Sequence, residues 1–254
     1  MSGFDARLPE WWQHWPGAAD GRARVPTMRL LLIDSALSLC TAAVFEDGTA
    51  LAVRSELMVK GHQERLAGFV RDAMTGAGID FSALDRIGVT TGPGSFTGLR
   101  VGLAFAQGFG AALDVPVVGI STLDALAATI ATDAPVPQAV AALIDARRGQ
   151  VYARFWRDGV ALGPAEALSL EAAAARIADL GPGATLVGSG APLLADTLPA
   201  AVAIDLPGPS PAALARLVAA ADPRLSPPEP RYLRAPDATP PTRLPGQPRA
   251  SARS

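Results

Sequence analysis

Short apolar runs and one helical repeat define the first half of the chain. The uniformly apolar run at 29–34 predicts a buried strand, and residues 40–46 predict a second one. Asp47 and Gly48 then form a hairpin signal, and the alternating residues 49–57 predict a third strand. We therefore expect three antiparallel strands at the start of the first domain.

A helix and two strand–helix pairs follow this meander. From His62 onward apolar residues recur at the spacing of one helix face, which Gly76 and Gly78 should end. The residues of this face are Leu66, Phe69, Val70, Ala73, Met74 and Ala77. Further strands are predicted at 85–91 and 115–120, and further helices at 97–113 and 121–131. The element order is βββαβαβα.

The same pattern then begins a second time. Gly48 follows Asp34 by 14 positions, and Gly159 follows Asp145 by 14 positions, with matching apolar residues between them. The second copy continues with a helix at 170–180, a strand at 184–189 and a helix at 211–221. A duplicated βββαβα unit with an Asp ending each first strand predicts an α/β protein with the RNase H-like fold of the actin-like ATPases, the ASKHA class.

This duplication predicts the domain organisation. The Pro-broken stretch at 132–138 separates a lobe of residues 28–133 from a smaller lobe of residues 134–233. Residues 1–27, which include Trp11, Trp12 and Trp15, are expected to be a flexible extension. Residues 234–254 are rich in Pro and Arg, and we expect them to be disordered.

Composition narrows the class of protein. Hydrophobic residues make up 49% and charged residues 18% of the 254, and the formal net charge is −2, so a broad basic face for nucleic acid is not expected. The single cysteine, Cys40, lies in a predicted strand and is expected to fill the core. With no signal-peptide pattern and no apolar run long enough to span a membrane, a cytoplasmic protein is expected.

The segment TTGPGSFTGLR, residues 90–100, resembles a phosphate loop but fails both specific tests. A P-loop needs two glycines five positions apart and a Lys after the second, whereas Gly94 and Gly98 are four positions apart and Leu99 follows. A dinucleotide fingerprint fails by one position as well. Two interpretations stay open: a strand-to-helix turn capped by Ser95 or Thr97, or an anion site at a helix N-terminus.

The residues that follow the two strand-end aspartates also differ from those expected in an ATPase. Glycine should follow each Asp so that backbone N–H groups can approach phosphates, yet SALSLC follows Asp34 and two arginines follow Asp145. We expect no nucleotide or metal cofactor on the isolated chain, with Asp34, Ser35, Gly94 and Ser95 at most contributing contacts to ATP, ADP or Mg²⁺ within a complex. The two histidines, His14 and His62, do not form a metal pair, because Leu66 stands four residues after His62. No catalytic residue is predicted.

Several segments, in this order, resemble one bacterial family. They are LLIDSA, HQERL, GVTTGPGSFTGLRVGLAFAQG, VPVVGISTLDALA, IDARRGQVYARFW and PRYLR. They are similar to the TsaB (YeaZ) family of tRNA threonylcarbamoyladenosine synthesis, and the resemblance covers about residues 28–234. It implies an inactive, shortened paralogue of TsaD, the subunit that carries a metal through a His-x-x-x-His pair and transfers threonylcarbamoyl to N6 of adenosine 37.

The resemblance also implies the partners. They are a TsaD-like catalytic subunit, a TsaE-like ATPase, and tRNA reached indirectly through the complex. An actin-fold ATPase or kinase with atypical phosphate loops, and a peptidase M22-like hydrolase, remain as alternatives.

Small residues on the helix at 97–113 predict where the partner binds. Interior glycines destabilise a helix by about 1 kcal/mol each relative to alanine, so a close neighbouring backbone is expected, either the chain's own sheet or a partner. We predict that this helix and the preceding one form the partner surface, which is used for a homodimer when the partner is absent. The predicted interface residues are Leu66, Phe69, Val70, Ala73, Gly98, Gly102, Ala106 and Gly110.

Overall fold

The computed structural model describes residues 27–58, 61–130 and 137–234. Its first sheet has the order β3-β2-β1-β4-β5, in which β2 is antiparallel to β1 and β3, and β4 is parallel to β1 and β5. Its strands are β1 (Arg29–Asp34), β2 (Leu39–Glu46), β3 (Thr49–Leu57), β4 (Arg86–Gly92) and β5 (Val117–Ser121). The predicted meander and the two strands that follow it are therefore confirmed.

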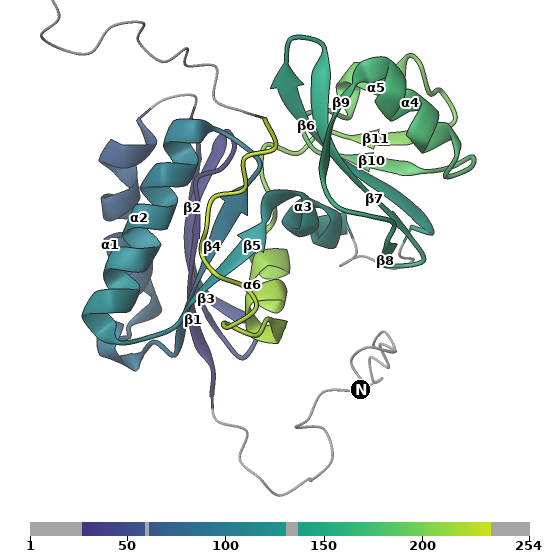
Figure 1. Ribbon diagram of the computed structural model, residues 1–254. Coiled ribbons are helices and arrows are strands. Elements are labelled where there is room, and N and C mark those ends of the chain that lie inside the picture. Colours follow the sequence, from purple (N-terminus) through teal and green to yellow (C-terminus); the bar gives the residue numbers. More distant parts are fainter. Residues whose placement is uncertain (1–26, 59–60, 131–136, 235–254) are drawn as a thin grey trace, which may run out of the picture.

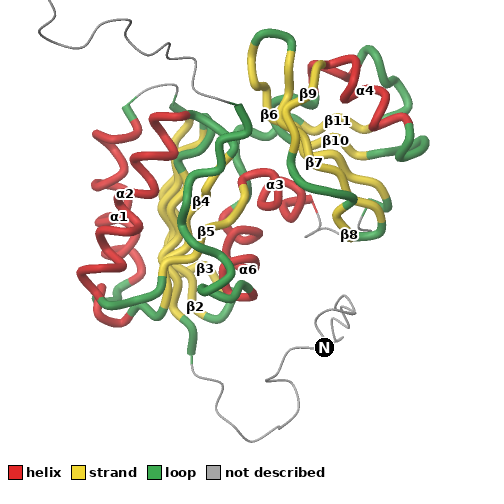
Figure 2. Tube along the Cα trace, in the orientation of Figure 1, coloured by secondary structure: helices red, strands yellow, loops and turns green. Residues whose placement is uncertain are grey.

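Helices cover both faces of this sheet (Figures 1 and 2). Two long helices, α1 (His62–Ala77) and α2 (Phe96–Leu113), lie side by side on one face, with the short helix η2 (Phe81–Ala83) after α1. The other face carries α3 (Thr122–Ile130) and α6 (Pro211–Ala220).

The second sheet repeats the first. Its strands follow the order β11-β10-β6-β7-β8, with β9 also paired to β7. They are β6 (Ala139–Arg147), β7 (Gln150–Arg157), β8 (Val160–Ala161), β9 (Glu166–Ser169), β10 (Thr185–Val187) and β11 (Val202–Ile204). Taking β9 as the third strand, both sheets have the strand order 3-2-1-4-5. The expected duplicated actin-like fold is thereby confirmed; α4 (Leu170–Ala178) and α5 (Pro192–Ala195) complete the second lobe.

Helix α6 corrects one assignment made from the sequence. The predicted helix at 211–221 belongs to the second repeat by chain order, but it packs on the first sheet, where Leu214 and Val218 share a core with Leu32. Arg86 holds it there, because its Nη1 donates hydrogen bonds to the carbonyls of Val218 at 2.7 Å and Ala221 at 2.8 Å. Chain order alone misassigned it because the linker before it crosses between the lobes.

The two lobes share a hydrophobic core. Leu123 and Leu126 of α3 are fully buried against Val140 and Ile144 of β6 and against Val187 of β10. Helix α3 therefore belongs to the first lobe by sequence and to both lobes by packing.

Several expectations fall outside the described residues. They concern the Trp-rich residues 1–26, the inter-lobe stretch 131–136 and the tail at 235–254. Within the residues that the structure describes, no helix has the length and apolar character to cross a membrane.

Candidate functional site

Asp34 lies at the carboxyl end of β1, where the two lobes meet. Its carboxylate is buried, and Oδ1 accepts hydrogen bonds from Thr90 Oγ1 at 2.7 Å and from the backbone N–H of Ala36 at 3.0 Å. A carboxylate taken out of water needs such donors to remain charged. These contacts tie the end of β1 to the neighbouring strand β4.

The segment 92–98 packs directly on the turn after Asp34. The N–H of Ser95 donates to the carbonyl of Ala36 at 2.7 Å, and Ser35 Oγ donates to the carbonyl of Gly98 at 2.8 Å. A methyl group on Gly98 would lie 2.0 Å from the Ser35 carbonyl oxygen, and one on Gly94 would lie 2.3 Å from that of Ala36. The glycines of this loop therefore allow two turns of the same chain to touch.

Ser95 is the helix cap expected from the sequence. Its Oγ accepts a hydrogen bond from the N–H of Gly98 at 3.2 Å. The four residues predicted as nucleotide or anion contacts are thus brought together. Asp34 and Ser35 are buried, however, and their side chains are hydrogen-bonded to Thr90 and to the carbonyl of Gly98. Of the two interpretations left open, this geometry favours the strand-to-helix turn.

The chain itself covers the Asp34 carboxylate. A methyl group on Gly208 would lie 2.9 Å from Leu39 Cβ and 3.5 Å from Asp34 Oδ2, so the backbone of this linker lies over the carboxylate. The N–H of Leu39 donates to the carbonyl of Pro207 at 3.0 Å, which fixes the linker in place. These residues do not fit a nucleotide phosphate, because the space next to Asp34 is filled by Leu39 and Gly208.

The corresponding Asp145 at the end of β6 is used differently. Its Oδ2 forms an ion pair with Arg147 Nη1 at 3.1 Å, and its Oδ1 accepts from the N–H of Arg147 at 2.7 Å. Arg147, two residues after this Asp, therefore pairs with the carboxylate where an ATPase would leave room for a phosphate. Among the described residues there is no group of three or more His, Cys, Asp or Glu side chains that could hold a metal ion.

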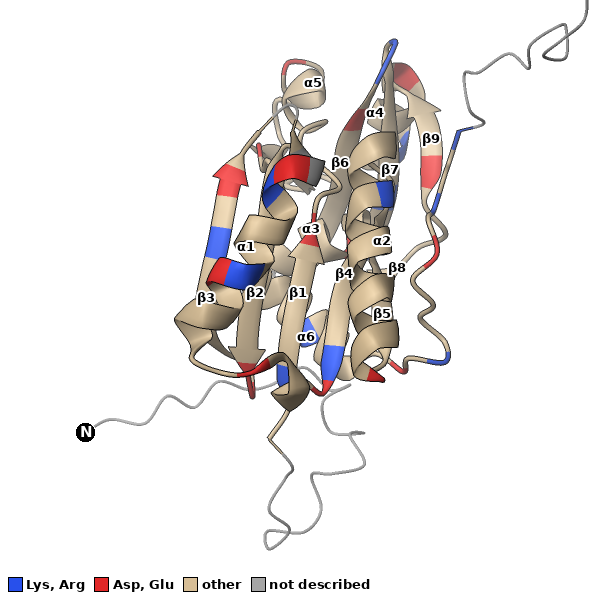
Figure 3. Cartoon of the chain, turned by 90° about the vertical axis from the view of Figure 1, so that its left-hand side faces the viewer, with Lys and Arg blue, Asp and Glu red and all other residues tan. Residues whose placement is uncertain are grey.

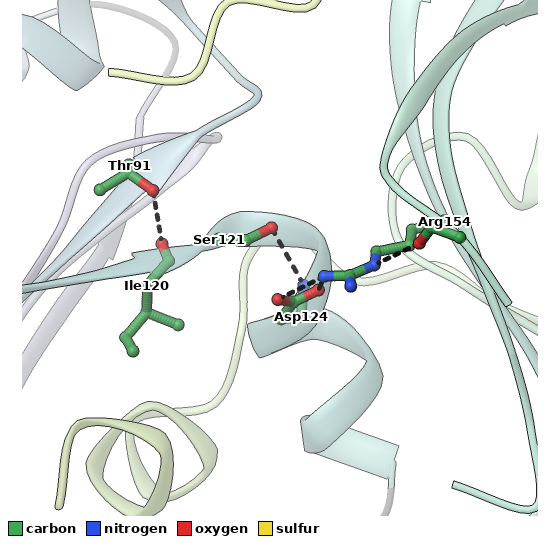
Figure 4. Close-up of polar contacts among 6 residues, drawn as sticks. Thr91, Ile120, Ser121, Asp124 and Arg154 are labelled. Carbon is green, nitrogen blue, oxygen red and sulfur yellow. Dashed lines mark hydrogen bonds and ion pairs between the residues drawn. The ribbon is translucent and has the colours of Figure 1, made fainter. Parts of the chain in front are cut away.

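An ion pair joins the lobes beside this region (Figure 4). Arg154 Nη1 of β7 donates to both carboxylate oxygens of Asp124 in α3, at 2.5 and 2.7 Å, and its Nε donates to the carbonyl of Gly163 at 3.1 Å. Figure 4 also shows Ser121 capping α3 by accepting from the N–H of Asp124 at 3.5 Å, and Thr91 donating to the carbonyl of Ile120 at 3.2 Å. With the shared core, the Asp124–Arg154 pair fixes the lobes against each other.

Cys40 is no nucleophile at neutral pH. It is fully buried in β2, and burial raises the pKa of its thiol to about 11, with smaller contributions from the charges of Asp34 and Glu56. Its place in the hydrophobic core agrees with the expectation from sequence.

The residues predicted to face a partner lie inside the protein. Leu66, Phe69, Val70, Ala73 and Ala106 belong to the buried core between the two long helices and the first sheet. Gly98 and Gly102 meet Ser35, and a methyl group on Gly110 would lie 2.3 Å from Val117 Cγ2. The residue set is therefore corrected: close approach to the chain's own sheet explains these glycines. Whether the two helices bind a partner through their other faces stays a prediction.

The outward face of α2 has a different set of small residues. Ala104, Gly108, Ala111 and Ala112 are exposed, and a methyl group on Gly108 would meet no atom within 4 Å. Arg100 is the only charged residue among the 18 of α2, which Figure 3 shows as a helix almost without coloured bands. Phe105 and Phe109 are half-buried beside this face.

The sequence interpretation missed an ordered strap at the C-terminal end of the described chain. Residues 226–234 run along the first lobe, where the N–H of Gly119 donates to the Ser226 carbonyl at 2.9 Å and the N–H of Arg231 donates to the Thr91 carbonyl at 2.7 Å. Gly119 is the sequence feature that could have indicated the strap, because a methyl group there would lie 2.5 Å from the Pro227 carbonyl oxygen.

Comparisons with known proteins relate the chain to tRNA modification. A family model described as TsaD, tRNA N6-adenosine threonylcarbamoyltransferase, matches residues 53–169. An uncharacterized protein of Mycobacterium tuberculosis is 38% identical over 221 residues, which cover 86% of this chain and 97% of that protein. The tRNA threonylcarbamoyladenosine biosynthesis protein TsaB of Escherichia coli is 38% identical over 132 residues, or 52% of this chain and 56% of the TsaB chain.

Solved structures agree with these relatives. YeaZ from Pseudomonas aeruginosa is similar with a TM-score of 0.67 at 26% identity, covering 81% of this chain and all of that one. A second structure from the same organism, described as similar to peptidase YeaZ, has a TM-score of 0.69 at 29% identity and covers 82% of this chain.

Proposed function

Because the chain belongs to the TsaB/YeaZ family, we propose that it is a non-catalytic subunit of the complex that forms threonylcarbamoyladenosine at position 37 of tRNA. Its role is to pair with and activate a TsaD-type transferase, which supplies the catalytic residues and the metal. A TsaE-type ATPase joins the pair, and the complex is cytoplasmic.

One observation carries the non-catalytic part of this proposal. The strand-end carboxylate of Asp34 is buried, hydrogen-bonded to Thr90, and covered by the linker at Gly208. An actin-fold ATPase needs this position open to phosphate and metal. Opening it here would require separating the lobes across Leu123, Leu126 and the Asp124–Arg154 pair. The isolated chain should therefore neither bind nor hydrolyse ATP between its lobes.

The activating part of the proposal rests on the outward face of α2. A charge-poor helix with exposed Ala104, Gly108 and Ala112 is typical of a surface that another helix covers. The half-buried Phe105 and Phe109 would become fully buried against a partner helix. When the partner is absent, the same face can pair with a second copy of the chain.

Co-purification tests the pairing. A tagged chain should retain an untagged TsaD-type subunit during size-exclusion chromatography, and Gly108→Trp should abolish this while the circular dichroism spectrum and melting temperature stay near those of the wild type. Val160→Trp is a matched control, since Val160 is 67% exposed in the other lobe. Normal capture by Gly108→Trp would place the interface elsewhere, and no capture by the wild-type chain would contradict the proposed function.

A further inference from the structure

Three segments far apart in sequence meet at one end of the molecule, and arginines dominate them. The segments are the start of α2, the β6–β7 hairpin and the end of the strap, which Figures 1 and 3 place at the same end. We call this the arginine surface; its residues are Arg100, Arg147, Arg148, Arg231 and Arg234.

The strap connects the other two segments. The Tyr232 ring packs against Phe96 of α2 at a tilt of 35° with ring centroids 5.4 Å apart, and its hydroxyl accepts from Arg100 Nε at 3.4 Å. Arg234 donates to the carbonyl of Ala146 at 3.1 Å and to the Gln150 side chain. Because Tyr232 and Arg234 are two residues apart, their Cα atoms are separated by at most about 7 Å. The start of α2 and the hairpin are therefore neighbours.

The hairpin holds arginines where the backbone disfavours them. Arg148 and Gly149 are the two central residues of a two-residue turn with φ of 56° and 68°, which suits Asn, Asp or Gly at the first position. Two other hairpins of the protein have two-residue turns of this kind, and both use Asp-Gly, at Asp47-Gly48 and Asp158-Gly159. Arg147, just before the turn, also has a left-handed φ of 62°. On backbone grounds alone Asn, Asp or Gly would suit the position of Arg148 better, and the turn places two adjacent arginines at the tip of the hairpin.

The charge of this surface is opposite to that of the whole chain. Segments 94–100, 145–150 and 229–234 contain five arginines and two acidic residues, Asp145 and Glu229, for a formal charge of +3, whereas the chain as a whole carries −2. Asp145 is already paired with Arg147, and the first turn of α2 contains no acidic residue. Positive charge is therefore concentrated here within an otherwise acidic protein.

Exposed aromatic rings lie next to these charges. Phe96 is 48% and Tyr232 is 42% exposed, and the guanidinium of Arg100 lies 3.9 Å from the centroid of the Phe96 ring. Guanidinium groups bind phosphate through paired N–H donors, and exposed aromatic rings stack with unpaired bases. Arginines beside exposed aromatic rings are the combination with which proteins bind single-stranded nucleic acid, the guanidinium groups taking the phosphates and the rings the bases.

We propose that the arginine surface binds the sugar–phosphate backbone of RNA. Given the proposed function, on which the identity of the ligand rests, this RNA is the tRNA substrate, and the chain contacts it directly instead of only through its partner. Arg148, Arg231 and Arg100 contact phosphates, and Tyr232 lies against an unpaired base. Arg234 positions the strap on the hairpin.

Fluorescence anisotropy with the full chain and a labelled, unmodified tRNA transcript tests this proposal. Wild-type chain should bind at about 50 mM salt and lose most of its affinity by about 200 mM. Arg148→Gly and Arg231→Ala should each lower the slope of log affinity against log salt by about 0.7 to 0.9, the value for one phosphate contact. Arg224→Ala, an exposed arginine at the far end of the strap region, is the charge-matched control and should leave the slope unchanged.

Arg148→Gly also separates binding from folding. Glycine adopts a φ of 56° without strain, which offsets the loss of the Arg148 side chain, so the melting temperature should stay near that of the wild type while the RNA affinity falls. Undetectable tRNA binding by the wild type, equal binding by Arg148→Gly and Arg231→Ala, or an equal loss in Arg224→Ala would each overturn the proposal. Arg148 and Arg231 lie outside α2, so failure of partner capture through α2 leaves this test intact.

Discussion

Two glycines of α2 should respond in opposite directions to the same substitution by alanine. Gly98 lies in the first turn with its Cα facing the turn after Asp34, whereas Gly108 lies in the exposed interior of the helix. If the buried glycines exist for close packing on the chain's own sheet, Gly98→Ala must destabilise the protein and Gly108→Ala must stabilise it.

The magnitudes follow from the two environments. A methyl group on Gly108 meets no atom within 4 Å, so the change gains the helix propensity of alanine, about 0.8 to 1 kcal/mol. A methyl group on Gly98 would lie 2.0 Å from the carbonyl oxygen of Ser35, a backbone atom that side-chain rotation cannot move. Shifting α2 away from this turn should lower the free energy of unfolding by about 1 to 3 kcal/mol.

Urea unfolding followed by circular dichroism measures both changes. The two variants should differ by at least about 2 kcal/mol, or roughly 4 to 8 °C in melting temperature for a protein of this size. A stabilised Gly98→Ala variant would refute the packing explanation, because the loop would then have space at Ser35. A destabilised Gly108→Ala variant would show that this position is already covered within the monomer.

Three further predictions concern the core, the lobe contact and the strap. At pH about 8 the single thiol, Cys40, should react with iodoacetamide only after denaturation, because burial holds its pKa at about 11 and the thiolate forms only near that pH; rapid labelling of native protein would contradict its burial. A double-mutant cycle of Asp124→Ala and Arg154→Met should give a coupling free energy of about 1 to 3 kcal/mol in urea unfolding, since the charged pair is only partly exposed, and a value near zero would show that the pair does not join the lobes. Ending the chain after Leu225 should lower stability by about 2 kcal/mol through loss of the hydrogen bonds to Gly119 and Thr91, whereas ending it after Arg234 should leave the level of modified tRNA in cells unchanged.

The sequence was informative where local patterns decide the structure. Residues 49–57 and the face of α1 follow period-two and helical spacing, and the repeat from Asp34 to Gly48 and from Asp145 to Gly159 predicted two sheets of one topology. Short edge elements such as β8, β9 and β11 were missed, because two to four residues carry no periodicity.

The same local patterns could not predict packing between segments that are far apart in the sequence. The small residues of α2 indicated a close neighbour, but not whether Ser35 and Val117 or a second protein supplied it. Helix α6 and the strap return to the first lobe after the second one is complete, and nothing in their local sequence encodes this return. The coverage of Asp34 by Gly208 depends on the same crossing.

The level of threonylcarbamoyladenosine in cellular tRNA tests the central claim most directly. Mass spectrometry of nucleosides should show loss of this modification when the chain is depleted and its full recovery with wild-type protein. Asp34→Asn should restore it equally, because an amide oxygen can still accept from Thr90 Oγ1 and the N–H of Ala36, and no chemistry is assigned to the carboxylate. Unchanged modification after depletion, or a folded Asp34→Asn protein that fails to restore it, would contradict the account of a non-catalytic subunit.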